Sequence, residues 1–320
     1  MRYQQSNKML LAALDEYVTG HLEAKKALII MLNRSRLRVS QKYIKQMDDE
    51  YLVKPMKLLL VARSGTGKTH LINSLQKILM FPLVKLDATH LNPTGASGGI
   101  KPEKLREMIT EEARRMCKLY PERWEYLEFA IEETVVFIDE IDKLGASFDG
   151  SSNWNRHIQS SFLTLIDDKD DLAGVSYVFA GAFDSITRHK AVKKQLGFNS
   201  VEDDADTTHI EDKVLQSGLI PELVGRMNRI IELDVFTKQN FKDILVDRII
   251  PAKQRDLAAI GVFNVPLTDK EIDTIAEKAT KSAQGVRFLQ REIDNIYMES
   301  EFDGDFDVAI DEDFYLPGDL

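Results

Sequence analysis

Apolar positions along the chain follow two different periods, and these periods separate the expected strands from the expected helices. Short continuous apolar runs are typical of strands buried on both faces, and four of them occur: 57–61, 82–88, 134–140 and 175–183. Between these runs, apolar residues recur every three or four positions, as in amphipathic helices, over 69–79, 101–119 and 157–167. Strands that alternate with helices predict an α/β fold with a parallel sheet covered by helices.

The alternation has clear limits at both ends of the chain. Helical spacing covers 8–35, and a last strand-like run covers 229–235. Beyond it the apolar stripes predict successive helices at 236–250, 267–280 and 285–300, with 306–310 as one closing strand. We therefore expect two domains, a larger α/β domain over 1–235 and a smaller, mostly helical domain over 236–320.

Composition narrows the class of protein. The net charge of −10 argues against broad, sequence-independent DNA binding, because such binding depends on neutralising phosphates with Lys and Arg. The one basic stretch, 33–45, is expected to be a solvated helix end and linker. Cys117 is the only cysteine, which excludes an intrachain disulfide and a cysteine-based metal cluster. With no long apolar segment and no signal-peptide core, we expect a cytoplasmic protein without membrane contact.

Candidate chemistry begins at "LLVARSGTGKTH", where the first apolar run gives way to small residues. The sequence nearly matches the phosphate-binding loop G-x-x-x-x-G-K-[ST], with Ala62 in place of the first glycine. Such a loop needs converging backbone N–H groups, a helix N-terminus and a lysine that reaches the outer phosphates. Ala62 is small, so we expect a strained but open turn. The residues expected to hold nucleotide here are Ser64, Gly65, Thr66, Gly67, Lys68, Thr69 and His70.

A second motif, "VVFIDEID", supports the first. Asp139 and Glu140 end an apolar strand, as expected for one carboxylate that holds magnesium and a second that polarises the attacking water. Either acid alone is more often a solvated strand end, but after a phosphate loop at this distance the pair predicts a nucleotide hydrolase. Thr69 and Asp139 are the expected magnesium ligands, and Mg²⁺ and ATP the expected cofactors.

Six segments resemble, in order and spacing, the ClpX and HslU branch of the AAA+ protein unfoldases: "LDEYVTGHLEAKKAL", "ARSGTGKTHL", "LDATHL", "VVFIDEIDKL", "GLIPELVGR" and "GVRFLQREID". The likeness covers about residues 10–312. It implies an AAA+ ATPase domain over 1–235, a small helical sensor 2 domain over 236–320, and a ring, usually of six subunits.

The resemblance also implies roles for particular residues. Tyr17 and Val18, with Thr19, would pack around the adenine. Arg226 matches the arginine finger that reaches into the next subunit's site, and Arg287 matches the sensor arginine that contacts ATP in its own subunit. Both cations would stabilise charge that develops during phosphoryl transfer.

The chain departs from the family in several places. It lacks the cysteine-rich zinc module of ClpX, the long HslU insertion after the acidic strand, and the basic loop that ClpX carries before its fourth strand. The aromatic central-pore motif aligns with Gly95-Ala96-Ser97-Gly98, so Ala96 and Ser97 stand at the loop tip. Phe148 and Trp154 are alternative gripping residues, although Trp154 could equally anchor its own loop.

One tripeptide points to a partner. Leu196-Gly197-Phe198 falls where ClpX carries the loop that docks on the ClpP peptidase, and it is apolar within a polar segment. The alternative is a loop folded into its own surface. The sequence thus predicts an ATP-dependent, ClpX-like unfoldase of protein substrates, with ClpP as a candidate partner. A remodeller that works without threading or without a peptidase is a second hypothesis. A nucleic-acid-stimulated ATPase or loader is a third, which the acidic charge disfavours.

Overall fold

The computed structural model describes residues 6–91, 104–145, 152–167, 172–183, 210–263 and 266–304, and every structural statement below concerns these residues. The chain divides into two compact units, Met1–Val235 and Phe236–Leu320. Each unit has its own hydrophobic core.

The first unit is built on a five-stranded parallel sheet in the order β2-β3-β4-β1-β5. Its strands are β1 (Lys57–Val61), β2 (Leu83–Asp87), β3 (Val135–Asp139), β4 (Ser176–Gly181) and β5 (Arg229–Glu232). The α/β prediction is confirmed. Because all strands run in parallel, their starts share one edge of the sheet, here called the amino edge. Their ends share the opposite edge, the carboxyl edge.

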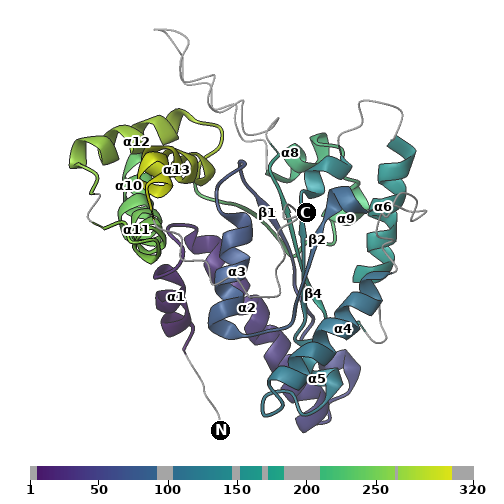
Figure 1. Ribbon diagram of the computed structural model, residues 1–320. Helices are drawn as coiled ribbons and strands as arrows, with labels where there is room; N and C mark the ends of the chain where they lie inside the picture. The colour runs from purple at the N-terminus through teal and green to yellow at the C-terminus, as the bar shows by residue number, and fades with distance from the viewer. Residues whose placement is uncertain are drawn as a thin grey trace, which may run out of the picture. The chain divides into compact units, whose positions relative to one another are not determined.

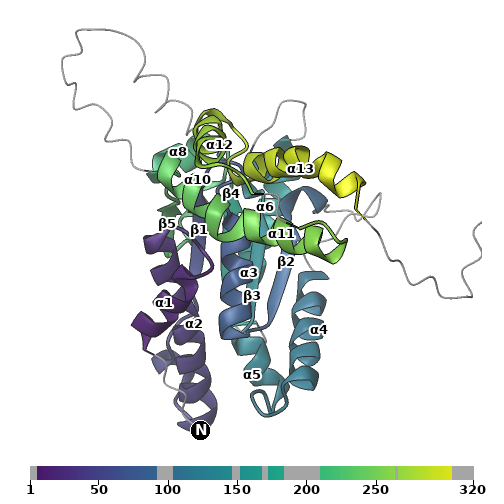
Figure 2. The ribbon, with the colours of Figure 1, turned by 60° about the vertical axis from the view of Figure 1, so that its left-hand side comes forward.

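Helices cover both faces of this sheet (Figure 1). On one face lie α1 (Asn7–Asp15), α2 (Leu22–Val39) and α3 (Lys68–Leu79), and on the other α4 (Lys104–Leu119), α6 (Ser152–Ile166), α8 (Ile210–Gln216) and α9 (Pro221–Val224). Figure 2 shows α3 lying across β3, with α1 and α2 side by side next to it. The strands supply both cores by alternation: Leu58 and Leu60 pack under α1–α3, whereas Leu59 and Val61 pack under α4 and α6.

The expected helix over 8–35 is two helices. The segment between them contains Gly20 and His21 in the left-handed region, with φ of 69° and 59°. Glycine adopts this conformation without cost, and His is among the few other residues that tolerate it, so the chain turns here without breaking its apolar spacing. The turn brings residues 16–21 to the carboxyl edge of the sheet.

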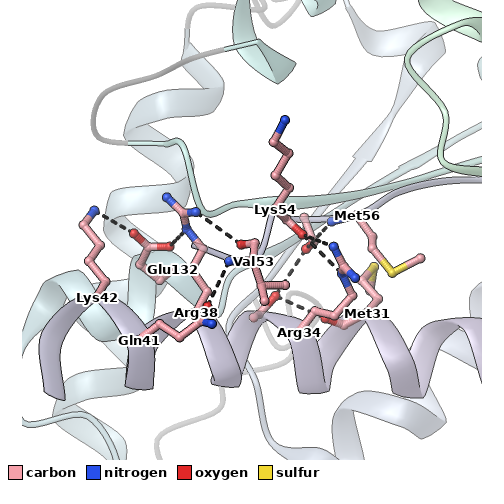
Figure 3. A network of polar contacts seen from close by, with 11 residues as sticks. Met31, Arg34, Arg38, Gln41, Lys42, Val53, Lys54, Met56 and Glu132 are labelled. Atoms are coloured by element: carbon pink, nitrogen blue, oxygen red, sulfur yellow. Dashed lines mark hydrogen bonds and ion pairs between the residues drawn. The ribbon is translucent and has the colours of Figure 1, made fainter. Parts of the chain in front are cut away.

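The basic stretch 33–45 is not a solvated linker. It continues α2 and then a π-helical turn, Ser40–Ile44, and its Arg38 is buried. Arg38 donates to Glu132 at 2.7 Å, and Lys42 donates to the other oxygen of the same carboxylate at 2.8 Å (Figure 3). Glu132 ends the short helix α5 (Leu127–Glu132), which precedes β3. These pairs therefore fasten α2 to the segment that enters the sheet at its amino edge.

The second unit is helical throughout its described part. It contains α10 (Lys238–Ile244), a π-helical turn (Leu245–Ile249), α11 (Ile250–Ala259), α12 (Asp269–Lys281) and α13 (Val286–Phe302). Thr237 and Thr268 begin α10 and α12 with capping boxes, in which side chain and backbone satisfy each other's donors. The strand expected at 306–310 lies outside the described residues.

Candidate nucleotide-binding site

The loop after β1 has the geometry of an anion cradle. Gly65 and Gly67 have φ of 73° and 89°, in the left-handed region that favours glycine. A Cβ added to Gly67 would meet nothing within 4 Å, so its backbone conformation, not lack of space, requires glycine. Thr66 closes the loop by donating from its hydroxyl to the Arg63 carbonyl at 2.8 Å.

Helix α3 begins immediately at Lys68, with no side-chain cap on its first turn. The N–H groups of that turn have no acceptor within the helix, and the helix dipole places partial positive charge at the same point. The Lys68 ammonium group donates to the Arg63 carbonyl at 3.4 Å, across the mouth of the loop. Backbone N–H groups, dipole and ammonium group together favour a phosphate here.

The acidic pair lies next to this loop. Thr69 donates from its hydroxyl to Asp139 Oδ2 at 2.8 Å, although the two residues come from α3 and β3. The second oxygen, Asp139 Oδ1, accepts the backbone N–H of Glu140 at 2.9 Å. Glu140 itself is exposed and has φ of 56°, an uncommon conformation for a residue with a side chain. Non-glycine residues held this way are concentrated at functional sites.

Strand β4 lies between β1 and β3, and its end completes the carboxyl edge. The backbone N–H of Ala182 donates to Asp142 Oδ1 at 3.1 Å, which ties the turn after β3 to the end of β4. A Cβ on Gly181 would lie 2.5 Å from the Phe183 ring and 2.8 Å from Asp142 Oδ1, so any larger residue would have to displace these two side chains. Sequence reasoning missed Asp142 and Gly181. The third acid of "IDEID", after Asp139 and Glu140, was the available signal for Asp142.

The segment 16–21 lies against the loop, as a nucleotide-binding segment should. A ring nitrogen of His70, Nε2, bonds to the Tyr17 carbonyl at 2.9 Å. Likewise, Nε2 of His21 bonds to the Thr66 carbonyl at 2.9 Å. The Val18 side chain is buried, whereas that of Tyr17 is about half exposed. The structure thus brings the segment of Tyr17 and Val18 next to the phosphate loop, and their contact with adenine stays a prediction.

His21 is a third residue that sequence reasoning missed. Its Nδ1 accepts a hydrogen bond from the backbone N–H of Asp234 at 3.1 Å. The ring hydrogen is therefore on Nε2, which donates to the Thr66 carbonyl. The side chain is fully buried. Burial is the main cause that lowers the pKa of His21, and it outweighs the nearby Asp234 carboxylate, which raises it. The imidazole therefore remains neutral near pH 7 and joins the loop to the end of the first unit.

Comparison with known proteins agrees with this geometry. Residues 58–194 match the family described as "ATPase family associated with various cellular activities (AAA)". The ATP-binding subunit ClpX of the Clp protease from Porphyromonas gingivalis is 25% identical over 90% of this chain and 75% of its own length. ClpX from Treponema denticola is 25% identical over 91% of this chain and 75% of its own length. ClpX 2 from Wolinella succinogenes is 26% identical, again over 91% of this chain and 75% of its own length. The chain is a ClpX-like AAA+ ATPase.

The site of this ClpX-like ATPase has suitable oxygen atoms for magnesium. Mg²⁺ binds few protein oxygens and keeps waters and phosphate oxygens as its other ligands. The Thr69 hydroxyl and the Asp139 carboxylate meet at 2.8 Å beside the phosphate loop, so both could bind one ion directly or through water. The residues present therefore fit the metal that the family uses with ATP.

Arg226 does not lie at this site in its own chain. It follows α9 and donates from Nε to both carboxylate oxygens of Asp167, at 3.0 and 2.8 Å. The same carboxylate lies 3.7 Å from the ammonium group of Lys57, the first residue of β1. Arg226 is therefore at the amino edge, whereas Lys68 follows the opposite end of β1. The four steps of that strand alone span about 13 Å.

The remaining predicted residues lie in the second unit, in α6 or outside the described residues. Arg287 is exposed in the first turn of α13. This helix begins directly after Gly285, which has φ of 54°. Trp154 lies in α6, without a described side chain. Outside the described residues are Ala96, Ser97, Phe148, Leu196, Gly197 and Phe198. Of the helices described above, none has both the length and the apolar composition needed to cross a membrane.

Proposed function

We propose that this ClpX-like ATPase forms a ring, of six subunits as in its family, and uses ATP hydrolysis to unfold or remodel other proteins. The observation that carries the proposal is the separation of Arg226 from Lys68 by the full length of β1. An arginine at the amino edge cannot reach phosphates at the carboxyl edge of its own chain. A complete site therefore takes this arginine from a second copy, and repetition of that contact closes a ring.

Each site residue has a role that follows from its chemistry. Lys68 would contact the outer phosphates, and Tyr17 and Val18 the adenine. Glu140 would orient and polarise the attacking water, since it is exposed next to the Thr69–Asp139 pair. Arg226 from the neighbour and Arg287 would stabilise charge that develops on the transferred phosphoryl group. Thr69 and Asp139 would hold magnesium, which would neutralise phosphate charge.

Mixing two inactive variants tests action between subunits. Arg226→Ala should bind ATP but fail to hydrolyse it, and Lys68→Ala should fail to bind it. In mixed rings an Arg226→Ala subunit can bind ATP and receive an intact Arg226 from a Lys68→Ala neighbour, so part of the activity should return. If rings that contain both variants are isolated and hydrolyse nothing at any ratio, Arg226 does not act on a neighbour.

A protein substrate is tested by the rate at which a folded client is unfolded. We expect loosely folded clients to be processed and stable ones poorly, because Ala96 and Ser97 offer little apolar surface for gripping a chain. Ala96→Tyr should then strengthen pulling. If Ala96→Tyr gains nothing, and Phe148→Ala with Trp154→Ala loses nothing on any client, the remodeller that does not thread its substrate becomes the better hypothesis.

A ClpP-type peptidase is the proposed partner of Leu196-Gly197-Phe198. Several copies per ring would dock together, which raises the apparent affinity well above that of one loop. Phe198→Ala should abolish co-sedimentation with ClpP and leave ATP hydrolysis unchanged. Unaltered co-sedimentation would remove this segment from the interface.

Stimulation of hydrolysis by DNA but not by unfolded protein would favour the nucleic-acid motor instead.

A further inference from the structure

The contact between Arg226 and Asp167 uses one particular side of the guanidinium group. A guanidinium carries five N–H donors, one on Nε and two on each terminal nitrogen. Only Nε donates to Asp167, to Oδ1 at 3.0 Å and to Oδ2 at 2.8 Å. Within the part of the chain that the structure describes, no hydrogen bond engages the two terminal nitrogens. The four donors that suit bidentate binding of a phosphate therefore stay available.

The backbone beneath Arg226 is fixed independently of this contact. The Arg226 N–H donates to the Leu223 carbonyl at 3.1 Å, which closes the turn after α9. Two residues later, Asn228 pairs with Lys57 in both directions: its N–H donates to the Lys57 carbonyl at 2.7 Å, and its side-chain oxygen accepts the Lys57 N–H at 2.6 Å. The freedom that remains is therefore in the Arg226 side chain, which is about half exposed.

Asp167 restricts that freedom. It follows the last turn of α6, so its carboxylate is presented by a helix on the same face of the sheet as α9. It also separates two cations, since Lys57 lies 3.7 Å from one of its oxygens. Without the carboxylate, Lys57 and Arg226 would repel each other, and the arginine side chain would turn toward solvent.

We propose that Asp167 is the positioning residue of Arg226: it holds Nε so that the two terminal nitrogens point outward to the phosphate of a nucleotide bound by the neighbouring subunit. The inference rests on the proposed function of Arg226. In this role Asp167 would act only through the arginine, and not on the nucleotide or on the attacking water itself. It would lower the cost of ordering a long side chain at the moment of reaction, in the manner of other preorganised catalytic groups.

The first test is steady-state ATP hydrolysis by Asp167→Ala. We expect kcat to fall about threefold to tenfold, the scale of an exposed ion pair strengthened by two acceptor oxygens, with KM for ATP unchanged. Asp167→Asn keeps one oxygen that can accept from Nε, so its kcat should lie between those of the wild type and Asp167→Ala. Glu222→Ala removes an exposed carboxylate from α9, four residues before Arg226, and should behave as wild type.

The second test separates positioning from a general structural role. In rings that already carry Arg226→Ala, adding Asp167→Ala should leave the residual rate unchanged, because the residue through which Asp167 acts is gone. A further loss in that background would overturn the proposal, as would wild-type kcat in Asp167→Ala alone. If Arg226→Ala itself hydrolyses ATP at the wild-type rate, the proposed function of Arg226 fails first, and the inference fails with it.

Discussion

The two edges of the sheet carry charge in opposite ways. At the amino edge the Glu132 carboxylate is buried and receives two cations of its own chain, Arg38 and Lys42 (Figure 3). At the carboxyl edge Asp139 accepts from a hydroxyl and an amide N–H, which are neutral donors, and Glu140 is exposed. The Glu132 carboxylate is neutralised by cations of its own chain, and these ion pairs fasten helices to the sheet. The carboxylates of Asp139 and Glu140 are not neutralised in this way, which suits them to a ligand that brings its own cation.

The largest expected effect concerns the carboxyl edge. Glu140→Gln should lower the rate of ATP hydrolysis about 10²- to 10⁴-fold, the usual contribution of a general base. The amide keeps the shape of the side chain, so nucleotide affinity and the free energy of unfolding should stay near wild type. Hydrolysis and nucleotide binding are measured on the same preparation. Full turnover by Glu140→Gln would remove Glu140 from the chemistry.

The matching change at the amino edge, Glu132→Ala, should mainly lower the stability of the fold. Glu132→Ala leaves Arg38 and Lys42 without their common carboxylate, and breaking a buried pair in this way costs about 3–5 kcal/mol of stability. Glu128→Ala, on the exposed side of the same helix, is the control and should change little. Urea unfolding measures both. If Glu132→Ala is as stable as Glu128→Ala, the ion pairs do not hold α2 to the sheet.

The same network can be broken without touching a charge. A Cβ at Gly174 would lie 1.5 Å from Glu132 Oε2, so Gly174→Ala has to displace the carboxylate from its partners. We expect a loss of stability of about 1–3 kcal/mol, the usual cost of overpacking a filled site. Combined with Glu132→Ala it should add little, because the atoms in conflict are gone. Additive losses would mean that Gly174 acts on something other than Glu132.

A smaller effect depends on pH and concerns His21. Burial lowers its pKa in the folded protein, so between that lowered value and the unfolded value of 6.5 the unfolded chain binds a proton that the folded chain does not. The contribution of His21 to the free energy of unfolding is therefore constant above about pH 6.5. Below that pH it decreases, by at most about 1.4 kcal/mol per pH unit for one proton. Unfolding should depend on pH less steeply in His21→Gln. His157→Gln, at an exposed site in α6, should retain the wild-type dependence.

The sequence was sufficient where one segment determines its own structure. Four continuous apolar runs and the strand-like run at 229–235 predicted the five strands of the sheet, and the AAA+ fold and ATPase activity are confirmed. It was insufficient where partners are far apart in the chain. Arg38 and Glu132 are 94 residues apart, and His21 and Asp234 are 213 apart, so no local pattern connects them. The site residues remain predictions, although the structure brings Lys68, Thr69 and Asp139 together.

Ala62 gives the smallest and most local prediction. It was expected to strain the phosphate loop, but it is not among the residues with positive φ, and its N–H donates to the Gly181 carbonyl at 3.2 Å as a continuation of the strand pairing. Its methyl group is buried in the core under α1–α3. Restoring the glycine of the general motif should therefore bring no gain in ATP affinity. It should instead cost about 0.5–1 kcal/mol of stability, because glycine loses more backbone freedom on folding and packs no side chain. Nucleotide titration and urea unfolding of Ala62→Gly measure the two quantities, and tighter ATP binding at equal stability would show that the alanine does strain the loop.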